Sequence, residues 1–458
     1  MWGRGVPNHP GVVRPSCSGD VKVVDQYRDR SAALSVLDQV RRHKLLAVQA
    51  MRSVSSWNRL EPRERALANE IVLGVLRHRA FLDRALEGVT RELPRKDPRL
   101  MDVLRLGAYQ ILRLDGVPDH AAVDSTVGIV RRIKGPRIAG FVNAALRSLA
   151  DTRDEIIAAA EGWPAEDRYS IPDWLLAEFR DAVGENWEAE LELMNRPAPI
   201  TFRAVQGAVA VPAVILELAR WNLTAVEDTR FPEAVILPSN QPPYETAPFQ
   251  QGRIMPQDPA SQAVIRLADP LLGDLVIDLG AGLGTKTEQL FHRRTSPDQR
   301  ILAVDISPSR LGKLKERLPD PSVGALVADA TGNLPLRKGV AGTVILDAPC
   351  SNLGTLRRHP EIKWWRRARD LPAHAKRQGA MLRQGARLLG PGGRLVYAVC
   401  SFARAEGVDL VNGFLESHPR YRAVPVPEEF ALPGTPYMLT TPARHGTDLF
   451  FAAIIERV

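Results

Sequence analysis

From about residue 258 to the C-terminus, short apolar runs alternate with segments of helical or turn character. Five of these runs are rich in Val, Ile and Leu: DLVIDLG, RILAVDIS, VGALVADA, AGTVILDAPC and GGRLVYAVC. Runs of this length are typical of strands that are buried on both faces of a parallel sheet. Helical crossovers between such strands predict a doubly wound α/β domain.

Two other patterns precede this domain. From about Val24 to Ala160, apolar residues recur with the 3.6-residue period of packed helices, as in ERALANEIVLGVLRHR and LMDVLRLGAYQILRL. From Trp163 to about Gly252 the pattern is mixed: ITFRAV and EAVILP indicate strands, with a helix from about Val211 to Trp221 between them. The expected division is a flexible tail over 1–24, a helical domain over 25–162, a small α+β subdomain over 163–257 and the α/β domain over 258–458.

Composition narrows the functional classes. No apolar run approaches the roughly 18 residues that span a bilayer, and the N-terminus has no apolar core of a signal peptide. Three widely spaced cysteines do not make a disulfide framework, so a reducing cytoplasm is expected. Neither C-x-x-C nor H-x-x-x-H spacing occurs, which argues against a zinc site. Nothing in the pattern calls for a partner subunit, and a monomer is expected.

The net charge of +8 suggests an anionic partner, and the charge is concentrated in one segment. Between Arg357 and Arg394 there are eleven Lys or Arg and two acidic residues. The segment RRHPEIKWWRRARD also carries Trp364 and Trp365. Basic side chains neutralise phosphates and aromatic faces stack on unpaired bases, so RNA binding is one interpretation of this segment. Taken alone, the segment is more typical of a solvated helix whose tryptophans anchor it to the core.

The first apolar run leads into DLGAGLGTKT, where glycines 280, 282 and 284 allow a tight turn and close approach to a ligand. The G-x-G-x-G spacing differs from the G-x-G-x-x-G fingerprint of dinucleotide-binding proteins. Asp305, at the end of the next run, is placed to accept hydrogen bonds from ribose hydroxyls. A nicotinamide-dependent oxidoreductase stays open at this point.

Acidic residues end four successive runs: Asp278, Asp305, Asp329 and Asp347. A single aspartate at such a place is often a turn or helix-capping residue. Four at one edge of a sheet would repel the pyrophosphate of a dinucleotide, whereas S-adenosylmethionine is cationic at sulfur and has no phosphate. The acids therefore favour S-adenosylmethionine.

Two of the three cysteines, Cys350 and Cys400, follow the fourth and fifth runs. A lone cysteine there is often a small buried apolar residue, but two at the functional edge favour catalysis. A thiolate that adds to carbon 6 of cytosine makes carbon 5 nucleophilic towards a methyl sulfonium. Asp347 is placed to hydrogen-bond ring nitrogen 3, and the second thiol could assist release. The base has to be unstacked or single-stranded.

The segments DAPCS, GTLRRHPEIKWWRR and GGRLVYAVCS resemble the RNA 5-methylcytosine methyltransferase family, and more narrowly its bacterial ribosomal RNA members of the Sun (RsmB) type. Those proteins carry an N-terminal NusB-like helical RNA-binding domain, and LRLGAYQIL, VNAALR and RYSIPDWLLAEF fit that arrangement, as does QDPASQ. HGTDLFFAAIIERV resembles the family's last strand. The resemblance covers about residues 25–458 and implies a C-terminal Rossmann-like methyltransferase domain that acts on ribosomal RNA.

Matched by position, the resemblance implies that Cys400 is the nucleophile and that Cys350 helps to release the product. The S-adenosylmethionine contacts that it implies are Gly280, Ala281, Gly282, Leu283, Gly284, Thr285, Lys286, Asp305, Asp329 and Asp347, with Lys286 near the methionine carboxylate. The basic residues expected to contact RNA are Arg357, Arg358, Lys363, Arg366 and Arg367. No metal site is expected.

Three departures from the family's pattern stand out. Gly280, Gly282, Leu283 and Thr285 replace four residues of its loop Cys-Ala-Ala-Pro-Gly-Gly-Lys-Thr. Val399 replaces the threonine that usually precedes the nucleophile, and RAEG replaces Pro-Glu-Glu-Asn. Both cysteines, the three cofactor acids and the lysine remain, so an active enzyme is expected. A non-catalytic RNA-binding or ribosome-assembly factor on a decayed fold is one alternative, and a transfer RNA cytosine methyltransferase is another.

Overall fold

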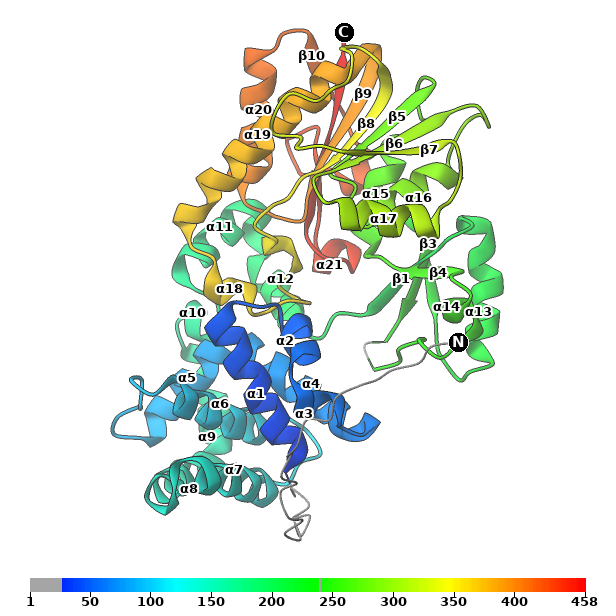
Figure 1. Cartoon of the computed structure of the whole chain (residues 1–458). Helices are drawn as coiled ribbons and strands as arrows, with labels where there is room; N and C mark the ends of the chain where they lie inside the picture. The colour runs from blue at the N-terminus through cyan, green and yellow to red at the C-terminus, as the bar shows by residue number, and fades with distance from the viewer. Residues whose placement is uncertain (1–26, 239) are drawn as a thin grey trace, which may run out of the picture.

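The computed structural model describes residues 27–238 and 240–458; the tail expected over residues 1–24 lies outside them. The first part of the chain is a bundle of helices (Figure 1). The helices are α1 (Arg28–His43), α2 (Ala47–Ser53), α3 (Ser55–Asn58), α4 (Pro62–Arg77), α5 (Arg79–Val89), α6 (Pro98–Leu112), α7 (Asp119–Lys134), α8 (Pro136–Asp151) and α9 (Arg153–Ala159). Helix α6 lies at the centre, since every residue from Leu100 to Leu112 is buried. The helical prediction for this region is confirmed.

A small sheet follows the short helices α10 (Ala165–Arg168), α11 (Asp173–Val183) and α12 (Trp187–Met194). Its strands are β1 (Ile200–Ala204), β2 (Val226–Asp228), β3 (Phe231–Leu237) and β4 (Ile254–Pro256), antiparallel in the order β2-β3-β1-β4. Helix α13 (Val211–Ala219) packs on it through a shared apolar cluster, and α14 (Ala247–Gln250) precedes β4. The two strands and the helix predicted here are confirmed.

The large sheet is the framework of the C-terminal domain. Its strands are β5 (Leu275–Leu279), β6 (Arg300–Asp305), β7 (Val323–Val327), β8 (Ala341–Asp347), β9 (Leu389–Val399), β10 (Tyr421–Val424), β11 (Met438–Thr440) and β12 (Phe450–Arg457). The order is β10-β12-β9-β8-β5-β6-β7, and β11 pairs with β12. The five strands predicted from the apolar runs, β5 to β9, are mutually parallel, whereas β12 pairs antiparallel with β9.

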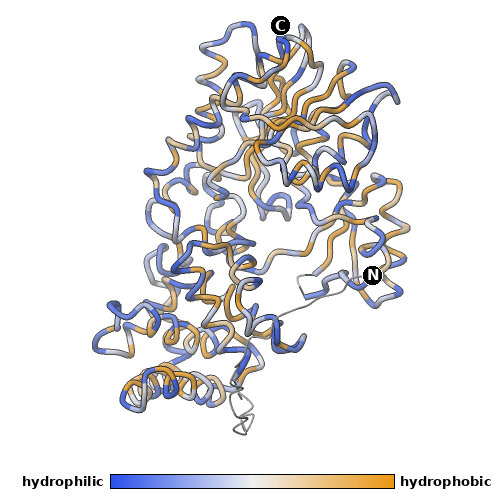
Figure 2. Tube along the Cα trace, in the orientation of Figure 1, coloured by the Kyte–Doolittle hydropathy of each residue, from blue (hydrophilic) through white to orange (hydrophobic). Residues whose placement is uncertain are grey.

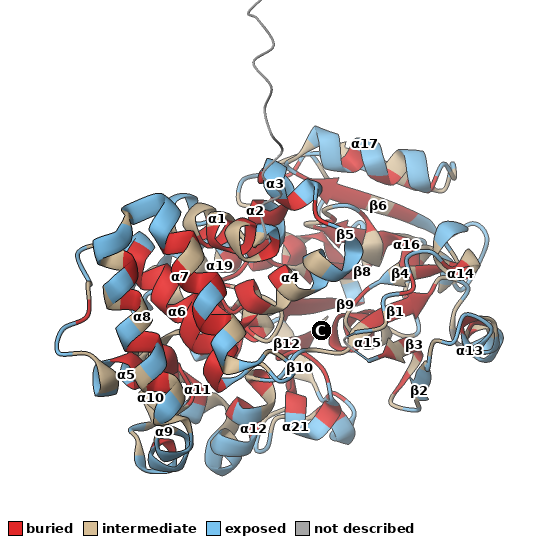
Figure 3. Ribbon diagram, turned by 90° about the horizontal axis from the view of Figure 1, so that it is seen from below, coloured by how far each residue is buried: buried red, intermediate tan, exposed pale blue. Residues whose placement is uncertain are grey.

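Helices cover both faces of this sheet. The helices of this domain are α15 (Pro259–Arg266), α16 (Thr285–His292), α17 (Pro308–Arg317), α18 (Ile362–Trp365), α19 (Leu371–Leu388), α20 (Val408–Ser417) and α21 (Pro442–His445). Successive side chains of a strand point to opposite faces: Val344 and Leu346 join the core under α19 and α20, whereas Ile345 joins the core under α15 and α17. Figure 2 shows the apolar residues concentrated along these strands, and Figure 3 shows the outer faces of the helices exposed. The doubly wound α/β prediction is confirmed.

Candidate active site

The ends of β8 and β9 bring the two predicted thiols together. The strands are parallel neighbours, with Asp347 opposite Ala398, and beyond them the Gly354 amide donates to the Cys400 carbonyl at 2.9 Å. The Cys350 Sγ lies 3.2 Å from the Cys400 Sγ. Cys350 is buried and Cys400 is half-buried, so Cys400 is the thiol that a substrate reaches more easily.

Asn352 links the two thiols, and sequence reasoning missed it. Its Oδ1 lies 3.1 Å from the Cys400 Sγ and 3.4 Å from the Cys350 Sγ, so both thiols can donate to one carbonyl oxygen. The backbone of Asn352 is left-handed, with φ of 62°, a conformation that asparagine tolerates better than most residues. The hydrogen bond with Cys400, together with burial, raises the pKa of the Cys350 thiol well above its ordinary value. Cys350 is therefore a neutral thiol at neutral pH.

Glu406 connects the turns that follow the two strands, and its side chain is fully buried. Its carboxylate accepts hydrogen bonds from the Ser351 amide at 2.9 Å and from the Ser401 hydroxyl at 2.6 Å. The Ser351 hydroxyl also donates to it, and the Gln378 side-chain amide does so at 2.9 Å. Each serine directly follows one of the cysteines, so one acid holds both turns. The only signal for Glu406 in the sequence was that RAEG, which replaces the family's Pro-Glu-Glu-Asn, keeps one glutamate.

The loop after β5 is shaped by its glycines. Gly280, Gly282 and Gly284 have φ values of 88°, 57° and 80°, in the region that favours glycine. A Cβ at Gly280 would lie 3.0 Å from the Asp347 carbonyl oxygen, and one at Gly284 would lie 2.2 Å from Leu314. The loop therefore runs close to the end of β8 and against α17, at the same sheet edge as the thiols.

Three of the four acids predicted at this edge lie on it. Asp305 Oδ2 accepts from the Gly282 amide at 2.9 Å, and Oδ1 accepts from the Ser307 amide at 2.8 Å, which fixes the loop against the end of β6. Asp329, two residues beyond β7, is exposed, and Asp347 is half-buried.

Asp278 departs from the expected rim of four acids. Its side chain is buried, and Oδ2 accepts from the Thr287 hydroxyl at 2.5 Å. Among the described residues, Oδ1 has no hydrogen-bond partner. Burial raises the pKa of Asp278 to about 6. The residue stands one position before the end of β5, which turns its side chain towards α16 instead of the edge.

Lys286 stands between the loop and the thiols. Its Nζ donates to Asp347 Oδ2 at 2.7 Å and to Ser261 Oγ at 2.8 Å. Burial alone would lower the pKa of this ammonium, but attraction to Asp347 outweighs it and holds the pKa above its ordinary value. Lys286 is therefore a fixed cation that holds the Asp347 carboxylate beside the thiol pair.

Exposed apolar side chains surround the glycine loop. Leu283, Ile306 and Val327 are 51%, 55% and 53% exposed. They lie in or after β5, β6 and β7, which are consecutive in the sheet order, so all three belong to one edge. Exposed apolar groups beside carboxylates and a lysine make a surface suited to a ligand with an apolar ring, hydroxyls and charged ends.

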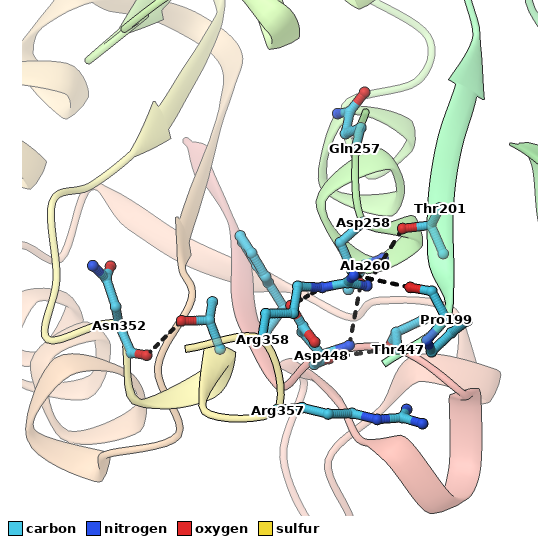
Figure 4. Close-up of polar contacts among 12 residues, drawn as sticks. Pro199, Thr201, Gln257, Asp258, Ala260, Asn352, Arg357, Arg358, Thr447 and Asp448 are labelled. Carbon is cyan, nitrogen blue, oxygen red and sulfur yellow. Dashed lines mark hydrogen bonds and ion pairs between the residues drawn. The ribbon is translucent and has the colours of Figure 1, made fainter. Parts of the chain in front are cut away.

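Arg358 lies at the centre of a polar cluster that joins three parts of the chain (Figure 4). Its guanidinium donates to Asp448 at 2.9 Å, to Asp258 at 2.8 Å and to the Pro199 carbonyl at 2.9 Å. Burial and the nearby Asp258 raise the pKa of Asp448 to about 7. Arg357 donates to the Pro197 carbonyl at 3.0 Å. Both arginines have partners within the protein, and their expected contact with RNA stays a prediction.

The rest of the basic segment faces the helical domain. Three hydrogen bonds cross between them: Lys363 Nζ to Arg77 O at 2.7 Å, Trp364 Nε1 to Leu76 O at 2.7 Å, and Ala47 N to Glu361 Oε1 at 2.8 Å. Burial lowers the pKa of Lys363 well below its ordinary value. Trp365 packs against both the helical core and the catalytic core, so the tryptophans do serve as anchors. Arg366 Nε donates to Ser351 O at 2.9 Å, and Arg367 is exposed.

Within residues 27–238 and 240–458, no group of three or more His, Cys, Asp or Glu is arranged to hold a metal ion. None of the helices in these ranges has the length and apolar character needed to cross a bilayer.

Known protein families match most of the chain. Residues 265–456 match the family model of the 16S rRNA methyltransferase RsmB/F, residues 27–151 match the NusB family, and residues 171–243 match the ferredoxin-like domain of RsmF/B-like methyltransferases. The ribosomal RNA small subunit methyltransferase B of Vibrio cholerae is 31% identical over 439 residues, which cover 93% of this chain and 97% of the relative. The protein of the same name from Escherichia coli is 29% identical over 438 residues, 93% and 98% of the two chains.

Solved structures share the fold. The structure titled PH0851 matches with a TM-score of 0.74 at 24% identity and covers 93% of this chain and 99% of its own. NSun6 from Pyrococcus horikoshii with SFG matches with a TM-score of 0.55 at 19% identity, over 63% of this chain and 98% of its own.

Proposed function

This chain belongs to the 16S rRNA methyltransferase RsmB/F family, and we propose that it transfers a methyl group from S-adenosylmethionine to carbon 5 of a cytosine in small-subunit ribosomal RNA. The observation that carries the proposal is the thiol pair, 3.2 Å apart, at the sheet edge that also holds Lys286 and the glycine loop. We also propose the division expected from sequence: an RNA-binding NusB-like domain over 25–162, a linker subdomain over 163–257 and a catalytic domain over 258–458.

The residues at the edge fit S-adenosylmethionine, which supplies the methyl group when bound. The glycine loop leaves room for a ligand close to the backbone at Gly282, because a Cβ there would meet only the Gly280 carbonyl oxygen, at 4.0 Å. Asp305 and Asp329 are the acceptors for hydroxyls, and exposed Ile306 offers an apolar surface to a base. Lys286, with its raised pKa, is a cation for a carboxylate.

Cys400 carries out the attack in this proposal. Its thiolate adds to carbon 6 of the cytosine, and the electron pair displaced from the 5,6 double bond makes carbon 5 the nucleophile for the methyl group. Asp347, held by Lys286 at 2.7 Å, takes the proton that the Cys400 thiol loses and delivers it to ring nitrogen 3, which polarises the ring for the attack. Asn352 orients the thiol, since its oxygen lies 3.1 Å from the Cys400 Sγ.

Cys350 acts in release. The hydrogen bond with Cys400 is the main cause of its raised pKa. When the Cys400 sulfur is bonded to carbon 6, it is a thioether and a weaker hydrogen-bond acceptor, so this cause is reduced. Cys350 then gives its proton to the Asp347 carboxylate, and the Cys350 thiolate takes the proton from carbon 5. The electrons of that bond restore the double bond, and the Cys400 thiolate leaves.

The non-catalytic alternative is not favoured. The departures in the loop leave its anchoring intact, because the Gly282 amide bonds Asp305. Val399 is fully buried and pairs with Phe451 of β12, so the change from threonine lies within the apolar core.

Methyl transfer tests the proposal directly. Purified protein, labelled S-adenosylmethionine and unmodified small-subunit RNA are expected to yield 5-methylcytosine, identified by mass spectrometry of the digested RNA. Transfer RNA in a parallel reaction tests the alternative substrate, and Cys400→Ser is the matched inactive control. Intact cofactor binding without transfer to any RNA would overturn the proposed activity.

A further inference from the structure

A cavity of about 600 Å³ opens between the helical domain and the catalytic domain, next to the thiols. Asn352, whose oxygen contacts both thiols, forms one wall. The other walls include Lys44 and Leu46 from the helical domain and Trp365, Arg366, Arg369 and His374 from the catalytic domain. We call this space the interdomain cavity. Its volume lies within the range of ordinary ligand pockets.

Most charged side chains that line the interdomain cavity are positive, and two of them are free to bind a ligand. Lys44 and Arg369 are exposed, and in the part of the chain that the structure describes their side chains have no hydrogen bond or ion pair. Arg366 donates one hydrogen bond, from Nε to the Ser351 carbonyl. Asp370, the acid in the wall, already accepts from the Arg367 amide at 3.0 Å. Free cations beside a half-buried thiol suit the phosphates of a bound strand.

The same cavity presents aromatic surfaces. Trp365 packs against the cores of both domains, which fixes its ring. Partial burial lowers the pKa of His374, so its ring is neutral at pH 7. Fixed aromatic rings beside cations are the combination that binds single-stranded nucleotides, through stacking and phosphate contacts together.

The helical-domain wall is held in place by contacts across the boundary. The buried Glu361 accepts from the Ala47 amide at the start of α2, and Leu46 packs on the catalytic core. Lys44 ends α1 with a left-handed backbone, φ of 50°, which turns the chain from α1 into α2. The position of Lys44 relative to the thiols is therefore set by the fold.

We propose that the interdomain cavity binds the nucleotide next to the target cytosine, with its phosphate at Lys44 and Arg369 and its base against Trp365 and His374. The inference rests on the proposed function. It gives the helical domain a direct part in substrate recognition at the active site, and it makes the sequence beside the target part of the specificity.

Charge reversal tests the phosphate contacts. Lys44→Glu and Arg369→Glu are each expected to raise the KM for small-subunit RNA about tenfold or more, with kcat and the KM for S-adenosylmethionine nearly unchanged. Each is also expected to reduce the dependence of log affinity on log salt by about 0.7 to 1. Lys313→Glu and Arg420→Glu are matched controls, because both side chains are exposed and lie outside the interdomain cavity and outside the helical domain.

Abasic substitution tests the base contact. Once the modified cytosine is mapped, RNA fragments without the base on its 5′ or 3′ side are compared with the intact fragment. Removing one of these bases should raise the KM of the wild type for the RNA fragment roughly fivefold or more. The same removal should change the KM of His374→Ala only slightly.

Two results would overturn the inference: charge-reversal variants that behave like their controls, or abasic fragments that all react like intact RNA. Failure of the proposed function would give a different result, because the wild-type protein would then transfer no methyl group. Filter binding of the RNA would still measure the effect of Lys44→Glu on RNA affinity.

Discussion

The Cys350 Sγ lies 3.2 Å from the Cys400 Sγ, and the two thiols share the Asn352 oxygen. They are similar in sequence, because each follows a strand and precedes a serine, but their surroundings differ. The more buried thiol, Cys350, has the raised pKa, whereas Cys400 is half-buried and more accessible. This asymmetry assigns different steps to the two sulfurs.

Alanine substitutions should separate the two roles. Cys350→Ala is expected to allow attack but to prevent release, so a covalent protein–RNA adduct accumulates and survives a denaturing gel. Cys400→Ala is expected to give neither product nor adduct. The double variant is the control for non-specific crosslinking. An adduct in Cys400→Ala, or its absence in Cys350→Ala, would contradict the assignment.

Replacing Glu406 with Gln should disturb the thiol geometry without touching the cofactor loop. Both carboxylate oxygens now accept hydrogen bonds, one from the Ser351 and Gln378 amides and the other from two serine hydroxyls. A glutamine has only one accepting oxygen, so its NH2 group replaces an acceptor for one of these two sets of donors. We expect a loss of about 1–3 kcal/mol in unfolding free energy and at least tenfold slower adduct formation in the Cys350→Ala background. The Kd for S-adenosylmethionine should stay within about twofold of the parent. Adduct formation at the parental rate would show that Glu406 does not position the thiols.

Much of the catalytic framework follows from the sequence. The strands are fixed by runs that only a doubly buried sheet accommodates, and successive crossovers place β8 beside β9. Cys350 lies three residues beyond the end of β8 and Cys400 one residue beyond the end of β9, so both thiols are expected at the same edge of the sheet. Asn352 was not predictable in this way, because its contact with both thiols depends on a left-handed backbone at a single residue.

Two other features were outside the reach of sequence patterns. A strand that is buried on both faces has no polar alternation, so the sequence does not reveal that Asp278 turns inward while Asp305 lies at the edge. A count of charged residues in a segment also does not reveal which of them form ion pairs with residues distant in the chain. Arg358 meets Asp258 and Asp448, which lie 100 and 90 positions away.

Asp278 should make stability depend on pH. Its pKa is about 6 in the folded protein, against an ordinary value of 3.8 for an aspartate, so the folded state binds the proton more tightly. Stability therefore falls as pH rises from about 4 to 6 and then levels off, by a total of about 3 kcal/mol. Asp278→Asn removes this decline, and urea unfolding at about pH 4 and pH 8 measures it. A wild type and variant with the same pH dependence would contradict the burial argument.

Lys286→Met should weaken cofactor binding. The substitution keeps the length of the side chain but removes the charge that holds Asp347 and that is proposed to meet the methionine carboxylate. Loss of a hydrogen bond between charged groups costs about 1.5–3 kcal/mol, or roughly a 10- to 100-fold rise in Kd. Calorimetry with S-adenosylmethionine measures the change. Lys313→Met on the exposed face of α17 is the control, and equal Kd values for the two variants would remove Lys286 from the site.

Arg358→Ala distinguishes a structural role from an RNA contact. The side chain is bonded to Asp258, Asp448 and the Pro199 carbonyl, and its removal leaves two adjacent carboxylates without their cation. Loss of one partner from a buried ion pair costs about 3–5 kcal/mol, so a clear fall in the unfolding midpoint is expected. This fall should be smaller at pH 6, because Asp448 has a pKa of about 7 and is mostly protonated there. Arg367→Ala, at an exposed position, should leave the midpoint unchanged. An Arg358→Ala protein with wild-type stability but weaker RNA binding would instead restore Arg358 to the RNA surface.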